Sequence, residues 1–304
     1  MRGIAGLKGA LGYVRAYRDR TFVIKLGGEV LADAEALDGV AAQVSLLWSL
    51  GIRVVLVHGG GPQASAASRR LGVEPRLVAG RRVTDDDALL VAKMVFAGQL
   101  NVDVLSALRR HHVSAVGLSG VDAELVTARV RPPTPMATGD GAVEIVDFGH
   151  VGDVADVDPG VLTTLLDARF LPVVASLAGD ADGRVYNVNA DTMAEALAVS
   201  LRAQKLLYLT GAPGVLRDRL DPATLVTFAD ADDLATLLAS GAVADGMRPK
   251  VEACIRAARG GVERTHVLDG RAPDSILCEV FTGAGCGTMI VARKEAPRDV
   301  ELVD

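Results

Sequence analysis

The chain has 304 residues, half of them hydrophobic and 4% aromatic, and its formal net charge is -6 at pH 7. A chain of this length buries a large core and is organised as one two-lobed unit or as two domains. An acidic balance without a basic stripe, together with so few aromatic side chains, argues against nucleic acid as the main partner.

The beginning of the chain lacks the apolar region of a secretory signal, and no apolar run approaches the roughly 18 to 20 residues that span a bilayer. We therefore expect a cytoplasmic protein that does not cross a membrane. Cys254, Cys278 and Cys286 are odd in number and lack metal-ligand spacing, so we expect reduced thiols and no metal site.

Short apolar runs rich in β-formers alternate with amphipathic helical patterns along most of the chain. The runs predict strands at 22–26, 54–57, 115–118, 171–175, 205–209 and 265–268. The helical patterns fall at 34–50, 63–71, 86–111, 159–168, 192–203, 231–239, 249–259 and 274–281. This alternation predicts an α/β fold with an open, mainly parallel sheet that is covered by helices on both faces.

The stretch from 123 to 158 interrupts the alternation. Segments 125–130 and 143–147, which flank a middle rich in proline and glycine, predict a hairpin. Such a hairpin is equally consistent with a lid over a small molecule and with a surface ribbon that closes a sheet edge. The turn-rich stretch 178–184 marks the expected seam between two lobes.

Two glycine turns follow the first two predicted strands. Lys25 precedes Gly27 and Gly28, and His58 precedes three glycines that open a helix. Exposed backbone N–H groups beside a fixed positive charge suit phosphorylated ligands at the ends of parallel strands. Neither turn has dinucleotide or Walker spacing, so the pair indicates phosphoryl transfer, with ordinary βα turns as the alternative.

Two further charged residues fall at predicted helix starts. Asp191 begins the helical pattern from Thr192, either as a cap or as a charge directed into a site. Lys250 lies in the first turn of another helix, where it opposes the helix dipole, so a nearby anion is expected to offset the repulsion. A solvated surface lysine is the alternative.

Seven segments, in order along nearly the whole chain, resemble the N-acetylglutamate kinases of the amino acid kinase family, of the arginine-sensitive type. The segments that carry the resemblance are 24–28, 58–63, 82–85, 117–120, 149–152, 187–191 and 246–250. The resemblance implies transfer of the γ-phosphoryl group of ATP to the side-chain carboxylate of N-acetyl-L-glutamate, in arginine biosynthesis.

The resemblance also implies roles for individual residues. Lys25 and Lys250 would hold the transferring phosphoryl group and Asp191 would hold the two lysines, while backbone N–H groups would come from four glycines, Gly27, Gly28, Gly60 and Gly61. Arg82 and Asn187 would bind the acceptor. The adenine side would be formed by Thr210, Gly211 and Gly214, with Mg²⁺ held mainly by the ATP phosphates. Gly211 and Gln99 depart from the family pattern, which commonly has Asp and Lys at these positions.

The two ends carry a separate signal. Apolar residues recur with a helical period from Leu7 to Tyr17. This segment resembles the N-terminal helix that joins dimers into hexamers in arginine-inhibited members, and a terminal helix packed on its own subunit is the alternative. The resemblance implies that L-arginine binds near Tyr13, His266, Glu279 and Gly285.

The resemblance implies three parts: an N-terminal helix in 1–20, an acceptor-binding lobe with the hairpin in 21–180, and a nucleotide-binding lobe with the regulatory segment in 181–304. Two other functions stay open. One is a kinase for another N-blocked acidic amino acid, such as N-succinylglutamate or a carrier-linked aminoadipate. The other is a kinase-fold arginine sensor without efficient turnover.

Overall fold

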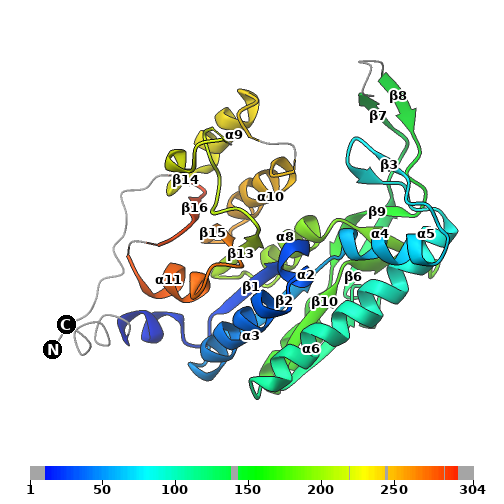
Figure 1. Ribbon diagram of the computed structural model, residues 1–304. Coiled ribbons are helices and arrows are strands. Elements are labelled where there is room, and N and C mark those ends of the chain that lie inside the picture. The colour runs from blue at the N-terminus through cyan, green and yellow to red at the C-terminus, as the bar shows by residue number, and fades with distance from the viewer. Residues whose placement is uncertain (1–10, 138–142, 219, 244–245, 284, 294–304) are drawn as a thin grey trace.

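The computed structural model describes residues 11–137, 143–218, 220–243, 246–283 and 285–293. Within these residues an eight-stranded sheet runs through the molecule in the order β14-β16-β15-β13-β1-β2-β10-β5 (Figure 1). Its strands are β1 (Thr21–Leu26), β2 (Arg53–His58), β5 (Ala115–Ser119), β10 (Leu171–Ala175), β13 (Lys205–Thr210), β14 (Phe228–Asp230), β15 (Arg264–Asp269) and β16 (Thr288–Val291). Only β16 pairs antiparallel, with β15. The expected open, mainly parallel sheet is confirmed.

The central strands are buried almost from end to end. All six residues of β13 and five of the six in β1 and in β2 are buried, which is why their sequences are continuous apolar runs without alternation. The six strands expected from these runs form within one or two residues of the expected bounds.

Helices cover both faces, as the right-handedness of parallel crossovers requires. The crossovers from β1 to β2 and from β2 to β5 advance in one direction along the sheet and place α3 (Ala34–Ser49) and α6 (Asn101–Arg110) together on one face. Those from β5 to β10, β10 to β13 and β13 to β15 advance the other way. They place α7 (Gly160–Asp167), α8 (Ala190–Ser200) and α10 (Arg248–Arg259) on the opposite face.

The remaining helices are short or peripheral. They are α2 (Gly28–Ala32), α4 (Gly61–Arg70), α9 (Ala231–Ala239), α11 (Ser275–Phe281) and the 3-10 turns η2 (Asp122–Glu124) and η3 (Pro222–Thr224). Residues 11–17 are also helical, which agrees with the expected N-terminal helix over the part that the structure describes. Leu7 and Ala10 of that expectation lie outside the described residues.

The expected hairpin of 125–130 with 143–147 is wrong in its pairing. The strand β6 (Val126–Val130) pairs instead with β9 (Val151–Val157), and these two strands join β11 (Leu177–Gly179) and β12 (Val185–Val188) in a small closed barrel. The segment at 143–146 is β8 (Val143–Val146), which pairs with β7 (Thr134–Ala137). The sequence does not predict β7 because it has prolines at 132, 133 and 135, and proline is rare inside strands.

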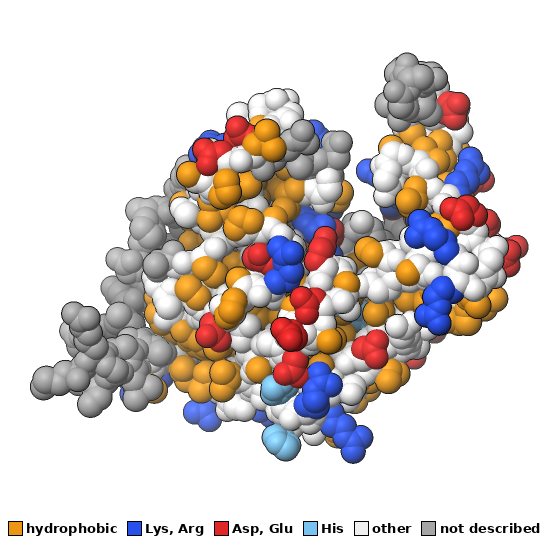
Figure 2. Space-filling view, in the orientation of Figure 1, with side chains coloured by type: hydrophobic (Ala, Val, Ile, Leu, Met, Phe, Trp, Pro, Cys, Tyr) orange, Lys and Arg blue, Asp and Glu red, His pale blue; other side chains and the backbone are white. Residues whose placement is uncertain are grey.

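The β7–β8 hairpin and the neighbouring hairpin of β3 (Leu77–Val78) and β4 (Arg81–Arg82) extend from one side of the molecule (Figure 1). A small buried cluster of Val83, Val146, Phe148 and Val151 joins their bases. The molecule is hollowed between this arm and the part that carries α9 and α10, and Lys and Arg side chains lie at the base of the hollow (Figure 2).

One long helix runs from Asp86 to Arg110 as α5 (Asp86–Ala92), the π-helical η1 (Lys93–Leu100) and α6. By length and composition this helix is apolar enough to cross a membrane, contrary to the expectation from the sequence. Half of its apolar window is nevertheless buried inside the protein, and its α6 part packs on β5 and β10. This burial is typical of a core helix in a globular protein.

Candidate active site

A buried carboxylate lies between two lysines at the ends of the central strands. Lys25 Nζ is 2.8 Å from Asp191 Oδ1, and Lys250 Nζ is 3.4 Å from Asp191 Oδ2. The side chains of Asp191 and Lys25 are 7% and 8% exposed, and that of Lys250 is 19% exposed. Three residues far apart in the sequence thus meet as two positive charges on either side of one negative charge.

The capping alternative for Asp191 is wrong. The N-cap of α8 is Asn189, whose Oδ1 accepts hydrogen bonds from the backbone N–H groups of Asp191 and Thr192. Because Asn189 satisfies these free donors, the Asp191 carboxylate in the first turn is available to the lysines. Burial opposes ionisation of Asp191, but the charges of Lys25 and Lys250 outweigh it and hold its pKa below the usual value.

Lys250 reaches Asp191 from the first turn of α10, in which Pro249 occupies one of the first two positions. Its Nζ also donates a hydrogen bond to the Gly246 carbonyl at 3.4 Å. The surface alternative for Lys250 is therefore wrong, because a carboxylate offsets its unfavourable place at a helix start.

The two glycine turns lie side by side next to this centre. Gln63 Nε2 donates to the Gly28 carbonyl at 2.9 Å, which joins the turns. A Cβ at Gly59 would lie 3.1 Å from Cβ of Ala190, the residue before Asp191. Gly60 has φ of 153°, which favours glycine, and Gly61 is the first residue of α4. Both turns open helices, so free backbone N–H groups gather beside the lysines.

The backbone of the first turn also contacts the nucleotide-side strand. A Cβ at Gly27 would lie only 2.5 Å from the Leu209 carbonyl oxygen and 3.4 Å from Thr210 Cα. Thr210 Oγ1 lies 3.0 Å from the Ala212 carbonyl oxygen in its own loop and 3.2 Å from the Leu268 carbonyl oxygen. Only glycine permits this close approach of β1 to the end of β13, which brings Thr210 to the same edge as Lys25.

Of the two expected acceptor residues, Arg82 contacts the second turn, and Asn187 contacts Thr84, two residues after Arg82. Arg82 Nη2 donates to the Gly61 carbonyl at 2.8 Å and to Ser65 Oγ. Burial and then the charge of Arg69 lower the pKa of Arg82, and an arginine stays charged despite such a shift. Asn187 Nδ2 donates to Thr84 Oγ1 at 3.2 Å. The neighbouring Arg81 is exposed.

Several residues of the site carry no recognisable signal in the sequence. Tyr208 is fully buried beneath the centre, and its hydroxyl donates to the Asp191 carbonyl at 3.0 Å. Arg271 Nη2 donates to the Gly211 carbonyl at 2.6 Å and pairs with Asp269.

The two glycines of the expected nucleotide loop are closely surrounded by other residues. A Cβ at Gly211 would touch Glu29 and Arg271. Gly214 has φ of 158°, with Thr288 Oγ1 2.5 Å from an added Cβ.

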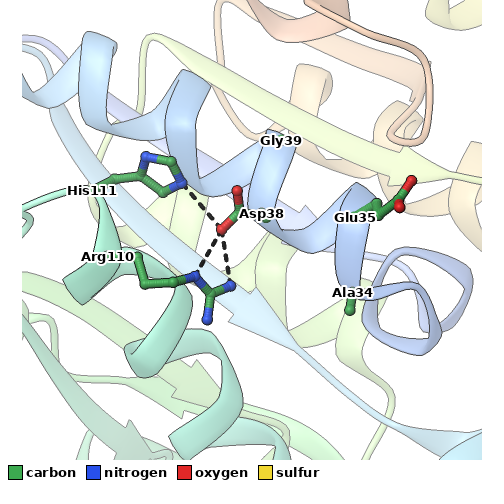
Figure 3. A pocket seen from close by; sticks show the side chains of 6 residues that line it. All are labelled: Ala34, Glu35, Asp38, Gly39, Arg110 and His111. Atoms are coloured by element: carbon green, nitrogen blue, oxygen red, sulfur yellow. Dashed lines mark hydrogen bonds and ion pairs between the residues drawn. The ribbon is translucent and has the colours of Figure 1, made fainter.

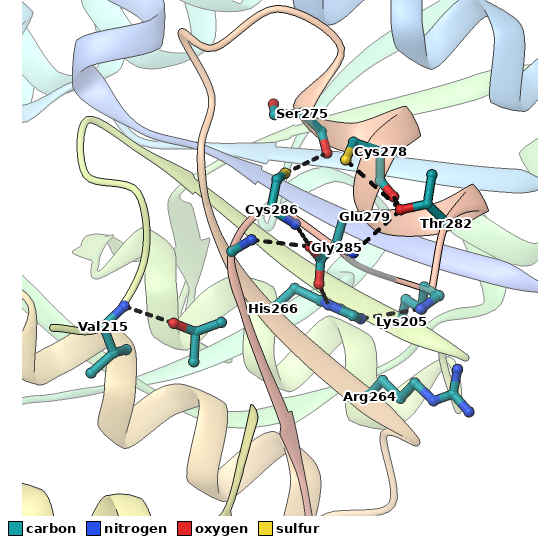
Figure 4. A network of polar contacts seen from close by, with 12 residues as sticks. Lys205, Val215, Arg264, His266, Ser275, Cys278, Glu279, Thr282, Gly285 and Cys286 are labelled. Atoms are coloured by element: carbon teal, nitrogen blue, oxygen red, sulfur yellow. Dashed lines mark hydrogen bonds and ion pairs between the residues drawn. The ribbon is translucent and has the colours of Figure 1, made fainter. Parts of the chain in front are cut away.

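The C-terminal residues singled out by the resemblance form a second polar network (Figure 4). His266 Nδ1 is 2.7 Å from Glu279 Oε1, and His266 Nε2 is 3.2 Å from Lys205 Nζ. Glu279 Oε2 accepts from the backbone N–H groups of Cys286 and Gly287. Although burial opposes it, hydrogen bonding to His266 lowers the pKa of Glu279 to about 2. Gly285 has φ of 62° beside this carboxylate.

The N-terminal helix packs next to this network. Tyr17 is buried, stacks with Tyr13 at 6.2 Å between ring centroids, and lies under Lys205 Nζ at 5.2 Å. Tyr13 itself is only partly buried. The residues expected to regulate the protein are thus neighbours in space, although they come from opposite ends of the chain.

A separate cavity of about 640 Å³ lies between α3 and the end of α6 (Figure 3). In it, Asp38 Oδ1 accepts from Arg110 Nε at 2.9 Å and lies 3.2 Å from His111 Nε2. None of the residues that line it belongs to either polar centre described above. Among the described residues, no group of three or more His, Cys, Asp or Glu side chains is placed to hold a metal ion.

The family model described as amino acid kinase family matches residues 20–269. The chain belongs to the amino acid kinase family. Over 289 residues it is 48% identical to acetylglutamate kinase from Myxococcus xanthus, with 94% of each chain covered. It is also 43% identical over 287 residues to acetylglutamate kinase from Symbiobacterium thermophilum, with coverage of 94% and 97%.

Among solved structures of the amino acid kinase fold, the chain is similar to N-acetylglutamate synthase from Neisseria gonorrhoeae in complex with coenzyme A and N-acetylglutamate. The TM-score is 0.80 at 32% identity, over 96% of this chain and 64% of the synthase chain. The same synthase is also described in complex with coenzyme A and L-arginine. The chain thus spans about two thirds of the synthase.

Proposed function

We propose that the protein is an acetylglutamate kinase, which transfers the γ-phosphoryl group of ATP to the side-chain carboxylate of N-acetyl-L-glutamate. The observation that carries this proposal is the pair of lysines held on either side of buried Asp191, beside two glycine turns. The similarity of this chain to acetylglutamate kinases, over 94% of its length, supports the choice of acceptor.

The lysines supply charge where the transition state needs it. In phosphoryl transfer the equatorial oxygens carry negative charge while the attacking and leaving oxygens lie in line. Lys25 comes from a strand end and Lys250 from a helix start, so their ammonium groups approach from two directions. Asp191 fixes both side chains before substrates bind, which reduces the reorganisation needed during the reaction.

The chemistry needs no general base. The γ-carboxyl of an N-acylated glutamate has a pKa of about 4.3, so it is ionised at pH 7 and attacks phosphorus directly. One carboxylate oxygen forms a bond to phosphorus, the bond to the β-γ bridging oxygen breaks, and ADP leaves. A carboxylate acceptor therefore suits a centre made of lysines and backbone N–H groups better than an alcohol would.

Binding of the two substrates is assigned to opposite sides of the lysines. The Arg82 guanidinium, whose planar fork matches a carboxylate, is assigned to the acceptor α-carboxylate, and Asn187 is assigned to the acyl group. The loop with Thr210, Gly211 and Gly214 takes the nucleotide. Mg²⁺ enters with the ATP phosphates, since the free carboxylate oxygens needed for an all-protein site are not gathered in the described residues.

The proposal extends to regulation and assembly. L-arginine is assigned to the network of His266, Glu279 and Gly285 next to Tyr13, and the N-terminal helix to assembly of dimers into a hexamer. Support comes from the contact of Tyr17 with Lys205, which couples the helix to the network. A cytoplasmic location follows from the biosynthetic role. The lobe at 21–180 is assigned to the acceptor and the lobe at 181–304 to the nucleotide, except that β12, which carries Asn187, pairs with β11 and β9 and is assigned to the acceptor side.

The test is to trap the acyl phosphate. Purified protein is incubated with Mg-ATP, N-acetyl-L-glutamate and hydroxylamine, which converts an acyl phosphate into a hydroxamate that is detected as its coloured complex with ferric iron. Hydroxamate is expected with N-acetyl-L-glutamate and not with N-acetyl-L-glutamine, which lacks the side-chain carboxylate. A panel with N-succinylglutamate separates the neighbouring kinases, and no hydroxamate from any acidic acceptor would favour the sensor.

A further inference from the structure

The π-helical segment η1 packs against the second glycine turn. A Cβ added to Gly60 would lie 2.1 Å from Leu100 Cδ1 and 3.1 Å from Phe96 Cδ1. The next residue, Asn101, contacts His58 at the start of the same turn. Phe96, Leu100 and Asn101 are 3%, 2% and 4% exposed, so one short, buried stretch of the long helix packs directly against the turn.

The π-helical geometry is what brings these side chains to one face. In an α-helix, a separation of five residues rotates the side chain by about 140°, which would turn Asn101 away from Phe96. Here the Asn101 N–H donates to the Phe96 carbonyl, an i→i+5 bond that stacks the two residues. Short π-helical segments inside α-helices are frequent at functional sites, and this one aligns Asn101 with the apolar contacts to Gly60.

The hydrogen bonds of Asn101 determine which nitrogen of His58 carries the proton. Asn101 Nδ2 lies 3.2 Å from the Val173 carbonyl, 3.4 Å from the Leu118 carbonyl and 3.2 Å from His58 Nε2. Carbonyl oxygens only accept, so this atom is the amide NH₂ group, and its two hydrogens go to its two nearer partners, the Val173 carbonyl and His58 Nε2, which both accept. The proton therefore lies on Nδ1, which donates to the Gly59 carbonyl at 2.9 Å.

The Gly59 carbonyl and the Gly60 N–H belong to one planar peptide group and point in opposite directions. We propose that Asn101 is a positioning residue for phosphoryl transfer, which fixes His58 in the tautomer that anchors the Gly59 carbonyl, so that the Gly60 N–H stays directed into the site. This inference rests on the proposed role of the glycine turn in holding the phosphoryl group. Burial lowers the pKa of His58 to about 4, which keeps the ring neutral.

The kinetic test uses Asn101→Asp and Asn101→Ala. In Asn101→Asp an oxygen faces the two carbonyls and cannot donate to His58, so the tautomer changes. We expect kcat to fall by about tenfold or more, while KM for the acceptor changes by less than about threefold, because the Gly60 N–H acts mainly on the transition state. The matched control is Gln43→Ala, which removes an equally buried amide from α3 that hydrogen-bonds to main chain and should keep kcat.

The spectroscopic test does not depend on a folded Asn101 variant. The chain has five histidines, so ¹⁵N spectra of histidine-labelled protein resolve each ring, and His266→Gln separates the two buried ones. The wild-type His58 signal should show Nδ1 protonated and Nε2 unprotonated. A proton on Nε2 in the wild type, or a folded Asn101→Asp with unchanged kcat, overturns the inference. Lys25→Ala tests the proposed site separately from the role of Asn101: if this variant also keeps full turnover, the proposed site itself is wrong.

Discussion

At the residue scale, the centre is built around one buried charge that the fold has to compensate. An unpaired carboxylate as buried as Asp191 would cost several kcal/mol, and both compensating groups are lysines that lie where phosphate is expected. The sequence identified all three residues through their places at strand ends and helix starts. It did not identify Tyr208 or Gln63, because a buried tyrosine and a glutamine after a turn look like ordinary packing residues.

Removing either lysine should abolish most of the turnover. We expect Lys250→Ala and Lys25→Ala each to lower kcat by roughly a hundredfold or more, since each removes charge from where it develops in the transition state. Arg248→Ala is the matched control, because Arg248 lies in the same helix turn but contacts Glu252 and the Leu238 carbonyl. Steady-state rates of folded protein decide the matter. Near-normal turnover in Lys250→Ala would remove this residue from the centre.

Arg82→Lys should raise KM for the acceptor much more than KM for ATP. An ammonium group cannot reproduce a planar fork that matches a carboxylate. We expect an increase of about tenfold or more in acceptor KM, which corresponds to the loss of one charge-assisted hydrogen bond of about 1.5–3 kcal/mol. Arg81→Lys, on the exposed neighbour, should change neither constant. Equal effects of the two substitutions would place Arg82 outside the acceptor pocket.

At the scale of elements, patterns with strong periodicity predicted the fold and weak ones did not. The buried strands and the amphipathic helices formed near their expected bounds because burial itself created the pattern. The pairing of β6 with β9 was missed, since it joins strands across the inserted β7–β8 hairpin and no local signal marks such a partner. The π-helical turn in η1 was missed for a related reason: its sequence continues an ordinary helical pattern.

The long helix leaves apolar side chains on its outer face. Leu90, Met94 and Val102 are 56%, 46% and 59% exposed in the single chain, and such a stripe indicates a covered surface. We predict that it forms the dimer interface, so Met94→Glu with Val102→Glu should give monomers in light scattering at micromolar concentration. Leu220→Glu, at a residue that is 82% exposed, should leave the dimer intact. A dimer that survives the double substitution would place the interface elsewhere.

At the scale of the whole molecule, two buried histidines link folding to pH. Burial lowers the pKa of His58 and of His266 from 6.5 to about 4. Between these pH values the two rings bind protons in the unfolded chain but not in the native state. Their contribution to the free energy of unfolding is therefore full above pH 6.5 and falls as the pH drops toward 4. Each histidine should contribute a slope of roughly 1.4 kcal/mol per pH unit near pH 5.

Urea unfolding at several pH values measures this slope. His58→Gln and His266→Gln should each flatten the dependence between pH 6.5 and 4, whatever their effect on stability at pH 7. His112→Gln, on an exposed ring, should leave the slope unchanged. Parallel curves for wild type and the two buried-site variants would show that these rings are protonated in the native state.

The last prediction concerns communication between the two ends of the chain. L-arginine should inhibit turnover, and removal of residues 1–12, which include the beginning of the N-terminal helix, should leave an active dimer that no longer assembles further. Glu279 already accepts from His266 and from two backbone N–H groups, so Glu279→Ala would leave these donors unpaired. Glu279→Gln is the better variant because it keeps the size of the side chain while removing the charge that a guanidinium would seek.

The truncation must end before Tyr13, because Tyr17 is buried against Phe22 and accepts a hydrogen bond from Arg264. Deletion of residues 1–12 therefore tests assembly without opening the core. Light scattering with and without arginine, alongside rate measurements, should show loss of the larger assembly in the truncated form and weaker inhibition in Glu279→Gln, with kcat preserved in both. A full-length dimer whose rate ignores millimolar arginine would leave the helix as a local packing element, and the His266–Glu279 pair would then serve only to hold α11 against β15.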